Sequence, residues 1–184
     1  GLGDVYKRQA RFYASVGVTS FAPASMTLPY DVLEKAFGTA KRLVEEDIEG
    51  LSVLRGIQME GPFFCYAKRG AQNADYLKDP DFEGFKKLFD GCGGLVRIVD
   101  IAPELPGAAE FVAKAKELCT VSIAHTDSDY DHASAAVNAG VKAELCTCCR
   151  ITGNSNLVVG CRYYLLFLNL FTAQCTFYTF GKTI

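Results

Sequence analysis

The stretch GIQMEGPFFCYAKRGAQN, residues 56–73, ends an apolar run on a single carboxylate. Residues 53–59 have the composition of a buried strand, and Glu60 follows directly after them. Gly61 and Pro62 come next, and both residue types turn or break a regular backbone. A polar loop follows. A carboxylate therefore lies at the C-terminal end of a predicted strand, where the backbone changes direction.

Similar apolar runs recur along the chain and alternate with helix-period stretches. The predicted strands are residues 18–22, 53–59, 95–101, 120–124 and a short one near Val141. The predicted helices fall at residues 33–44, 82–89 and 108–118, with Pro29, Pro80 and Pro106 close to their starts. This alternation predicts an α/β protein with a parallel sheet covered by helices. Such units fit a TIM-type barrel or a doubly wound sheet, and periodicity does not choose between them.

Ionisable side chains follow three of the predicted strands. Glu60, Glu104 and His125 each come directly after an apolar run. Functional groups collect at strand ends in both architectures, so we expect these three to converge on one pocket. Each also has a purely structural interpretation. Glu60 can cap the turn that follows it, Glu104 can be a helix-start carboxylate, and His125 can belong to a helix N-cap region.

Composition narrows the class of protein. The net charge is -2 at pH 7, and without a strongly basic face nucleic acid is not an expected partner. The first residues lack the apolar core of a signal peptide. Only Cys65, Cys92 and Cys119 of the eight cysteines lie in the first 140 residues, which is not the pattern of a disulfide framework. We therefore expect a location in the reducing cytoplasm.

The amino-acid composition of the sequence changes after residue 142. The segment AELCTCCRITGNSN, residues 143–156, is rich in Cys and Thr. Residues 157–180 are apolar enough to suggest a membrane helix, but their polar and β-prone residues argue against one. The CTCC motif at 146–149 lacks a second Cys/His pair at zinc-finger spacing. We expect residues 143–184 to be an aberrant apolar tail, unrelated to the preceding domain or frame-shifted.

Four stretches resemble the N-acetylglucosamine-6-phosphate deacetylases, a family of the amidohydrolase superfamily. They are GVTSFAPASMT at 17–27, GIQMEGPFFCYAKRGAQN at 56–73, VDIAPE at 99–104 and VSIAHTDSDYDHASAAVNAG at 121–140. Their order and spacing are similar to those of the family over about residues 10–142. The element EGPF followed by a KGAQ-like loop is fairly specific to this deacetylase, whereas HTD or HSD after an apolar strand is shared more widely.

The resemblance implies a metal-dependent (β/α)8 barrel. Its reaction would hydrolyse the acetamide of N-acetylglucosamine 6-phosphate to glucosamine 6-phosphate and acetate. Carried over from the family, Glu60 and His125 would be metal ligands, and Gly61, Gln72 and Asn73 would bind the substrate. A zinc or iron-type divalent cation is implied, because such an ion lowers the pKa of bound water towards ~7 and polarises the acetyl oxygen. The implied partner is a phosphosugar, and a full-length family member would be a homo-oligomer.

The chain departs from the family pattern at several positions. Residues 1–9 look like an unrelated leader, and no His-x-His element stands near the start. A second metal-binding His of the family falls at Cys146, and the family's catalytic Asp has no counterpart, so we assign no catalytic residue. His132 has no family role. We expect residues 10–142 to be a partial barrel that is by itself a very poor deacetylase or none.

Two other functions stay open. Another amidohydrolase, acting on a cyclic amide or a nucleobase, would share the HTD element. A sugar-facing GAQN loop after EGPF is not general in that superfamily, which disfavours this alternative. A non-enzymatic interaction protein or membrane-attached fragment would use the tail, and the solubility of residues 10–142 compared with the full chain would identify it.

Overall fold

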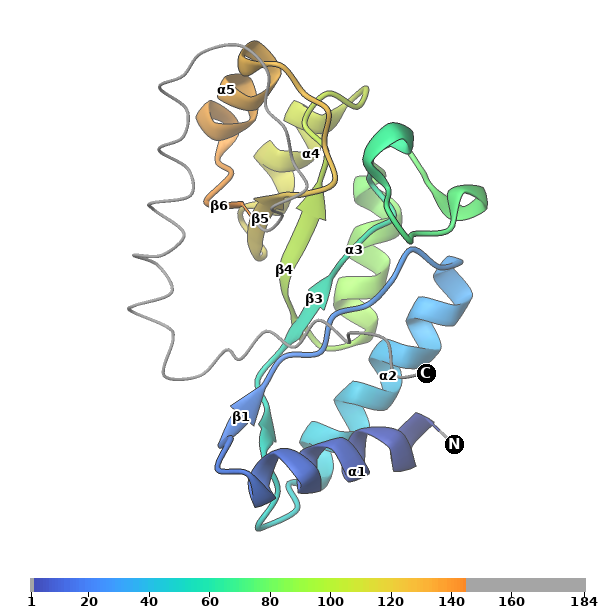
Figure 1. Ribbon diagram of the computed structural model, residues 1–184, viewed down its shortest axis with the longest axis vertical. Coiled ribbons are helices and arrows are strands. Elements are labelled where there is room, and N and C mark those ends of the chain that lie inside the picture. The colour runs from blue at the N-terminus through green and yellow to red at the C-terminus, as the bar shows by residue number, and fades with distance from the viewer. Residues whose placement is uncertain (1, 145–184) are drawn as a thin grey trace.

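The computed structural model describes residues 2–144 of the 184-residue chain (Figure 1), so all but the first residues of the predicted tail lie outside the described part. The helices are α1 (Leu2–Ser15), α2 (Tyr30–Glu46), η1 (Tyr66–Lys68), η2 (Ala74–Tyr76), α3 (Phe82–Gly91), α4 (Ala108–Ala115) and α5 (Tyr130–Ala139). The strands are β1 (Ser20–Phe21), β2 (Val53–Leu54), β3 (Ile57–Met59), β4 (Val96–Ile101), β5 (Thr120–Ile123) and β6 (Ala143–Glu144). The predicted α/β class is confirmed.

Every strand pairing in the described region is parallel, and the strands follow one another in chain order. β1 pairs with β2, and a second sheet has the order β3-β4-β5-β6. A bridge between Ala24 and Gln58 ties the segment after β1 to β3. A doubly wound sheet reverses its strand order at a switch point, and the order of these described strands does not reverse. The arrangement favours part of a barrel, and a complete barrel stays a prediction.

The helices form a layer on one side of the strands, and each main helix packs against the next along the chain (Figure 1). The side chains that β3, β4 and β5 contribute to the core are Ile57, Met59, Val96, Val99, Ile101, Val121 and Ile123. Phe85 of α3 and Phe111 of α4 meet within this core, with ring centroids 5.4 Å apart. Burial of these apolar groups is the main favourable term that holds the layer to the sheet.

Three polar residues lie between these core positions along the strands. Gln58, Asp100 and Ser122 are buried, and Asp100 stands opposite Ser122 in the register of β4 and β5. Because successive side chains of a strand point to opposite faces, these three belong to the face away from the core. The sheet therefore has one apolar face and one face with buried polar groups.

The helix starts agree with the prolines and carboxylates of the sequence. Pro29 is the N-cap of α2, and Asp81, next to Pro80, caps α3 by accepting a hydrogen bond from Gly84 N at 2.9 Å. Asp129 caps α5 in the same way through His132 N. No helix within residues 2–144 is long and apolar enough to cross a membrane.

The apolar run predicted as the second strand is divided into two elements. Arg55 N donates to Phe21 O at 2.9 Å, whereas Ile57 N donates to Leu95 O at 2.7 Å. Gln58 N still donates to Pro23 O at 3.0 Å, so the chain keeps its pairing with the segment after β1 while it joins β4. Regular strand structure is interrupted at Arg55 and Gly56. A Cβ at Gly56 would overlap an arginine side chain of β4, so only glycine permits this approach. The expectation of one continuous strand is wrong for this reason.

Helix α1 includes the residues that we assigned to an unrelated leader. Lys7 Nζ lies 2.5 Å from Glu46 Oε2, and Tyr6 packs against the edge of the core. Ala10 is fully buried, and its carbonyl accepts a hydrogen bond from Ser52 N at 3.1 Å. The boundary expected at residue 10 therefore lies inside one helix. A separate origin for residues 1–9 stays a prediction.

Candidate functional site

Glu60 and His125 come together at the carboxyl ends of two strands. Glu60 directly follows β3, and His125 lies just beyond β5. His125 Nε2 is 3.1 Å from Glu60 Oε1, and the two side chains are 12% and 26% exposed. The expected convergence of these two strand-end groups is confirmed. A carboxylate and an imidazole at this separation can share a proton or hold one cation between them.

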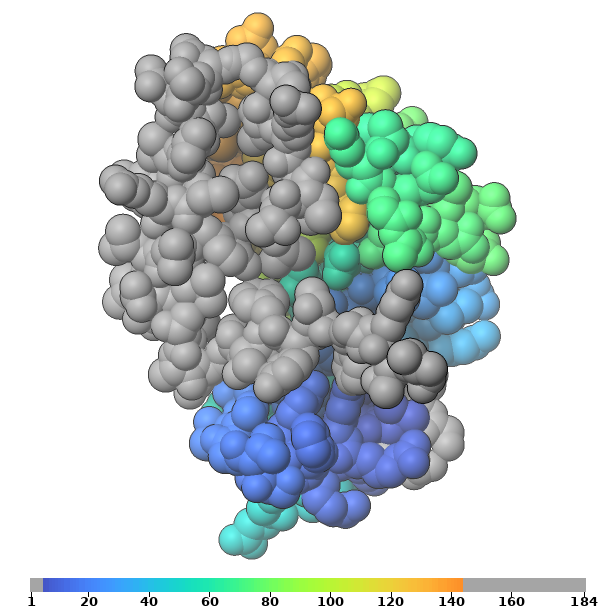
Figure 2. All heavy atoms as spheres, in the orientation of Figure 1, coloured from blue at the N-terminus to red at the C-terminus, as the bar shows by residue number. Residues whose placement is uncertain are grey.

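The loop after β3 fixes the backbone and the ring of His125. His125 has a positive φ of 49°, a conformation that side-chain-bearing residues seldom adopt. Cys65 N donates to His125 O at 3.1 Å, and the ring of Phe64 lies 4.3 Å from the imidazole, centroid to centroid. Figure 2 shows the green segment after β3 bordering the orange segment after β5. This contact orients the imidazole before any ligand binds.

The second ring nitrogen of His125 has a defined partner. His125 Nδ1 is 2.9 Å from the carbonyl oxygen of Lys68. A carbonyl oxygen only accepts hydrogen bonds, so Nδ1 carries a hydrogen, and Nε2 is the nitrogen that faces Glu60. A histidine that binds a metal commonly donates its other N–H to a backbone carbonyl in this way.

These two groups fit part of a metal site. Two donor atoms that bind a tetrahedral zinc ion at about 2.1 Å lie roughly 3.4 Å apart, a little more than the observed 3.1 Å between His125 Nε2 and Glu60 Oε1. Carboxylate oxygen and imidazole nitrogen suit zinc and other divalent transition metals. Within residues 2–144, however, no group of three His, Cys, Asp or Glu side chains is placed to hold a metal. Among the described residues, Glu60 and His125 could therefore supply two donors to such a site. The family-aligned position of a third, Cys146, lies outside them.

Gln72 joins Glu60 to the segment after β1. Its side chain is buried, and its Oε1 accepts a hydrogen bond from Thr27 N at 2.7 Å. Its Nε2 donates to Glu60 Oε1 at 3.1 Å. Glu60 Oε1 is thus approached by Gln72 and by His125 from two different loops.

The other two residues predicted to bind substrate lie close by along the chain. Gly61 has a φ of 89°, and a Cβ there would overlap the hydroxyl of Thr27. Asn73 is exposed, and its side-chain oxygen accepts from Asp75 N at 3.0 Å to cap η2. Gly61 therefore allows close packing beside Glu60, whereas the observed contact of Asn73 is structural.

Asp100 is a buried carboxylate that the sequence reasoning missed. It is fully buried on β4, and its Oδ2 accepts from Gln58 Nε2 at 2.8 Å. By continuation of the β3–β4 register, Asp100 lies in the same cross-strand row as Glu60. Burial raises the pKa of Asp100 to about 7, and the negative charge of Glu60 adds to that effect. A single Asp inside the apolar run of residues 95–101 was the available signal.

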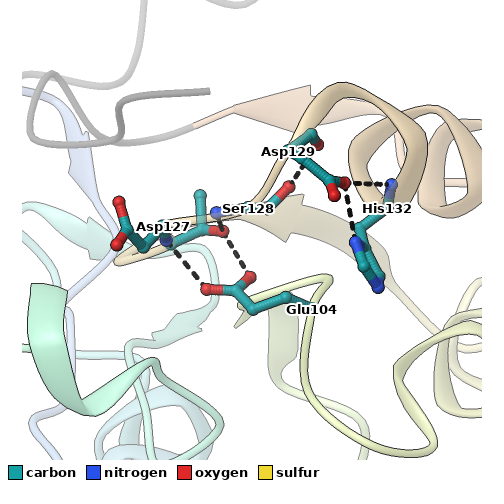
Figure 3. Close-up of polar contacts among 6 residues, drawn as sticks. Glu104, Asp127, Ser128, Asp129 and His132 are labelled. Carbon is teal, nitrogen blue, oxygen red and sulfur yellow. Dashed lines mark hydrogen bonds and ion pairs between the residues drawn. The ribbon is translucent and has the colours of Figure 1, made fainter. Parts of the chain in front are cut away.

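Glu104 does not join the pair, so this part of the prediction is wrong. Its carboxylate accepts from the hydroxyl of Thr126 and, at 2.8 Å, from Asp127 N (Figure 3). A strand-end carboxylate can hold a neighbouring loop instead of a ligand, and Glu104 does this for the loop that carries His125. It also lines a hollow of about 280 Å³ that Glu60 and His125 do not line.

His132 is separate from the site as well. Its Nδ1 is 2.6 Å from Asp129 Oδ1, and both side chains are 55% exposed (Figure 3). The hydrogen bonds from His132, first from its backbone N–H, lower the pKa of the Asp129 carboxyl. The pair belongs to the start of α5, and the absence of a family role for His132 stays a prediction.

Comparison with known proteins identifies related sequences. No protein-family model matches the chain. The N-acetylglucosamine-6-phosphate deacetylase of Bacillus subtilis is 35% identical over 128 residues, which cover 67% of this chain and 32% of that protein. That of Bos taurus is 36% identical over 134 residues, covering 71% of this chain and 32% of the relative. The chain thus spans about a third of the length of the curated relatives it matches.

Solved structures agree with the sequence comparison. The crystal structure of N-acetyl-D-glucosamine-6-phosphate deacetylase from Mycobacterium smegmatis aligns with a TM-score of 0.70 at 27% identity, over 77% of this chain and 36% of that one. A mutant of the same enzyme, solved in complex with N-acetyl-D-glucosamine-6-phosphate, aligns equally well. The Thermotoga maritima enzyme, at 19% identity and a TM-score of 0.65, shows the fold alone. The resemblance seen in the sequence is therefore confirmed for part of these enzymes.

Proposed function

We propose that this chain supplies two ligands of a divalent metal site. The enzyme that contains this site would hydrolyse the acetamide of N-acetylglucosamine 6-phosphate. The chain is similar to about a third of the length of the N-acetylglucosamine-6-phosphate deacetylases. One observation carries the proposal. Glu60 Oε1 and His125 Nε2 lie 3.1 Å apart at the ends of two parallel strands, and the other imidazole nitrogen is turned to a backbone carbonyl. Metal-binding histidines usually have this second contact.

Each residue around the pair has a defined task in this proposal. Glu60 and His125 would hold zinc or an iron-type ion, which when bound supplies an ionised water and polarises the acetyl oxygen. The Lys68 carbonyl keeps the hydrogen of His125 on Nδ1, so that Nε2 is directed to the ion. Gly61 lets the backbone turn beside Glu60 without a side chain in the way.

The substrate would lie against the loop that follows β3. Gln72 Nε2 has two hydrogens, and one is used by Glu60, so the other can reach a sugar oxygen. Asn73 would contact the sugar through its amide group, because its side-chain oxygen already caps η2. The described residues include no group that we assign as the general acid and base, and the family's catalytic Asp has no counterpart in the sequence.

The proposal extends to the whole protein. Residues 10–142 would be part of a (β/α)8 barrel, with residues 1–9 of separate origin although they belong to α1. Ala143 and Glu144 pair with β5 as β6, so an unrelated tail would lie within residues 145–184. The described cysteines, Cys65, Cys92 and Cys119, are free thiols, which supports a reducing cytoplasmic location. The partner would be a phosphosugar, and the full-length assembly a homo-oligomer.

Zinc binding and acetate release by the full chain test this function. We expect zinc to promote binding of N-acetylglucosamine 6-phosphate, seen as amide chemical-shift changes at Gln72 and Thr126. We expect turnover far below that of ordinary enzymes, because catalytic zinc sites normally use three protein ligands. Cysteine thiolates also bind zinc, so the informative quantity is the zinc affinity lost in Glu60→Gln. If that variant binds zinc and substrate as well as the unmodified chain does, the assignment is wrong.

A further inference from the structure

Gln72 is hydrogen-bonded at both ends of its side-chain amide, and one end meets Glu60. We infer that Gln72 is a positioning residue that fixes the Glu60 carboxylate for metal binding, an inference that rests on the metal site proposed above. It adds a second role to the substrate contact implied for Gln72 by the family resemblance. The two roles are compatible, because each uses a different hydrogen of Nε2.

The orientation of the amide is set by its first partner. Thr27 N–H, 2.7 Å away, can only donate, so the atom of Gln72 that faces it must be the oxygen Oε1. The nitrogen Nε2 is then the atom 3.1 Å from Glu60 Oε1, where it donates to the carboxylate. Reversing the amide would place two donors together at Thr27 and two acceptors together at Glu60. Both contacts therefore require the same orientation.

Burial makes this arrangement rigid. Gln72 is 8% exposed and Thr27 is 1% exposed, so water does not compete freely for either hydrogen bond. The bond to Glu60 is charge-assisted, which makes it stronger than a bond between neutral groups. A shorter Asn side chain would not span both partners. Gln72 therefore connects the segment after β1, the loop after β3 and the end of β3 through a single side chain.

Glu60 has two partners that come from different loops. Glu60 Oε1 receives Gln72 from one loop and lies against His125 Nε2 from another. The carboxylate oxygen that lies against His125 is thus also held by a side chain from a second loop. Partners of this kind orient metal ligands, and their loss typically costs about 10–100-fold in metal affinity.

Gln58 provides a matched control. It is another buried glutamine whose amide nitrogen donates to a carboxylate, in this case Asp100 Oδ2 at 2.8 Å. Gln58→Met removes a buried amide–carboxylate bond of the same kind, on the strand that leads to Glu60. It should destabilise the fold without releasing the proposed ligand, so it separates loss of stability from loss of positioning.

The experiment measures cobalt affinity in the full chain, with Glu60→Gln as the reference that defines binding at this site. We expect Gln72→Met and Gln72→Ala to lower that affinity about 10–100-fold. We expect Gln58→Met to leave it within about threefold, and hydrogen exchange at Thr27 N–H to speed up in both Gln72 variants. Unchanged cobalt affinity in the Gln72 variants, or an equal loss in Gln58→Met, would overturn the inference.

A metal-free readout separates this inference from the proposed function. If Glu60→Gln does not change cobalt binding, the proposed metal site has failed, and the positioning contact is then judged from a double-mutant cycle. In that cycle the shift in thermal midpoint for Glu60→Ala with Gln72→Met should be smaller than the sum of the two single shifts. Additive shifts would show that Gln72 does not act through Glu60.

Discussion

His125 Nε2 lies 3.1 Å from Glu60 Oε1, although the two residues are 65 positions apart in the chain. The contact is built by the ends of β3 and β5 together with the loop that contains η1. That loop contributes main-chain atoms of Cys65 and Lys68, which bond the carbonyl and the ring of His125. The pair therefore depends on three segments that meet at the carboxyl end of the sheet, where parallel α/β proteins place their functional groups.

Glu60→Gln tests the charge of this pair. The amide keeps the shape of the carboxylate but removes its negative charge. Loss of a residue that only hydrogen-bonds to a metal ligand already costs about tenfold or more in metal affinity. We therefore expect zinc affinity to fall at least about tenfold when the ligand itself is changed. Isothermal titration with zinc measures the change. Glu104→Gln is the matched control, because Glu104 bonds Thr126 and Asp127 instead of the pair. An equal loss in both variants would mean that strand-end carboxylates act only through the general charge of the region.

The backbone of His125 gives a second prediction. At a φ of 49° glycine is favoured over alanine, because glycine has no Cβ to clash. We expect His125→Gly to be more stable to urea than His125→Ala by up to about 1 kcal/mol, the reverse of the usual order. Both variants lose the imidazole contacts equally. A more stable alanine variant would show that this segment relaxes out of the left-handed conformation.

Glu60 and His125 could be identified from the sequence because each is an ionisable residue directly after a predicted strand. Glu104 carries the same signal and was grouped with them, but its carboxylate bonds the loop after β5. Residue type alone cannot separate a ligand from a loop anchor, because both are strand-end carboxylates. The atoms that orient His125 were not predictable, since a carbonyl such as that of Lys68 occurs in every residue.

The helices and strands that were predicted correctly are those with a regular spacing of apolar residues. Helices α2, α3 and α4 and strands β4 and β5 lie where apolar spacing placed them. The interruption at Gly56 was missed, because it depends on the close approach of β4 and not on the local pattern. Asp100 was missed because an apolar run with one Asp was treated as a uniform buried strand. Its side chain in fact points to the polar face of the sheet.

Gly61→Ala tests the close packing beside Glu60. The residue has a φ of 89°, and an added Cβ would overlap Thr27, so we expect a loss of about 2 kcal/mol or more in the free energy of unfolding. Gly38→Ala in α2 is the control. A Cβ there meets nothing within 4 Å, and we expect a gain of about 0.5–1 kcal/mol. Urea unfolding compares the two, and similar changes of the same sign would contradict the argument.

Lys68→Ala tests whether the loop is held by charge or by its main chain. Lys68 Nζ lies 3.2 Å from Asp127 Oδ1, and the side chains are 30% and 48% exposed. Exposed pairs contribute little, so we expect the free energy of unfolding to change by less than about 1 kcal/mol. The bond from His125 to the Lys68 carbonyl remains in the variant, and zinc affinity should stay within about threefold. A tenfold loss of zinc affinity would assign the positioning of His125 to the ion pair.

Asp100→Asn tests the buried carboxylate through the pH dependence of stability. Burial raises the pKa of Asp100 to about 7 in the folded chain, whereas an unfolded Asp titrates near 3.9. Between about pH 4 and pH 7 the folded chain keeps a proton that the unfolded chain has lost. This contribution to the free energy of unfolding therefore falls by up to about 1.4 kcal/mol per pH unit as pH rises, and it levels off above about pH 7.

The Asn side chain can still accept the hydrogen bond from Gln58, but it carries no proton that titrates in this range. We expect Asp100→Asn to be the more stable chain at pH 8 and to lose that advantage as the pH is lowered towards 4. Urea unfolding of both chains at intervals between pH 4 and pH 8 measures the difference, in which the other titrating groups largely cancel. Parallel curves for the two chains would show that Asp100 keeps a nearly normal pKa, and that water or a cation reaches the polar face of the sheet.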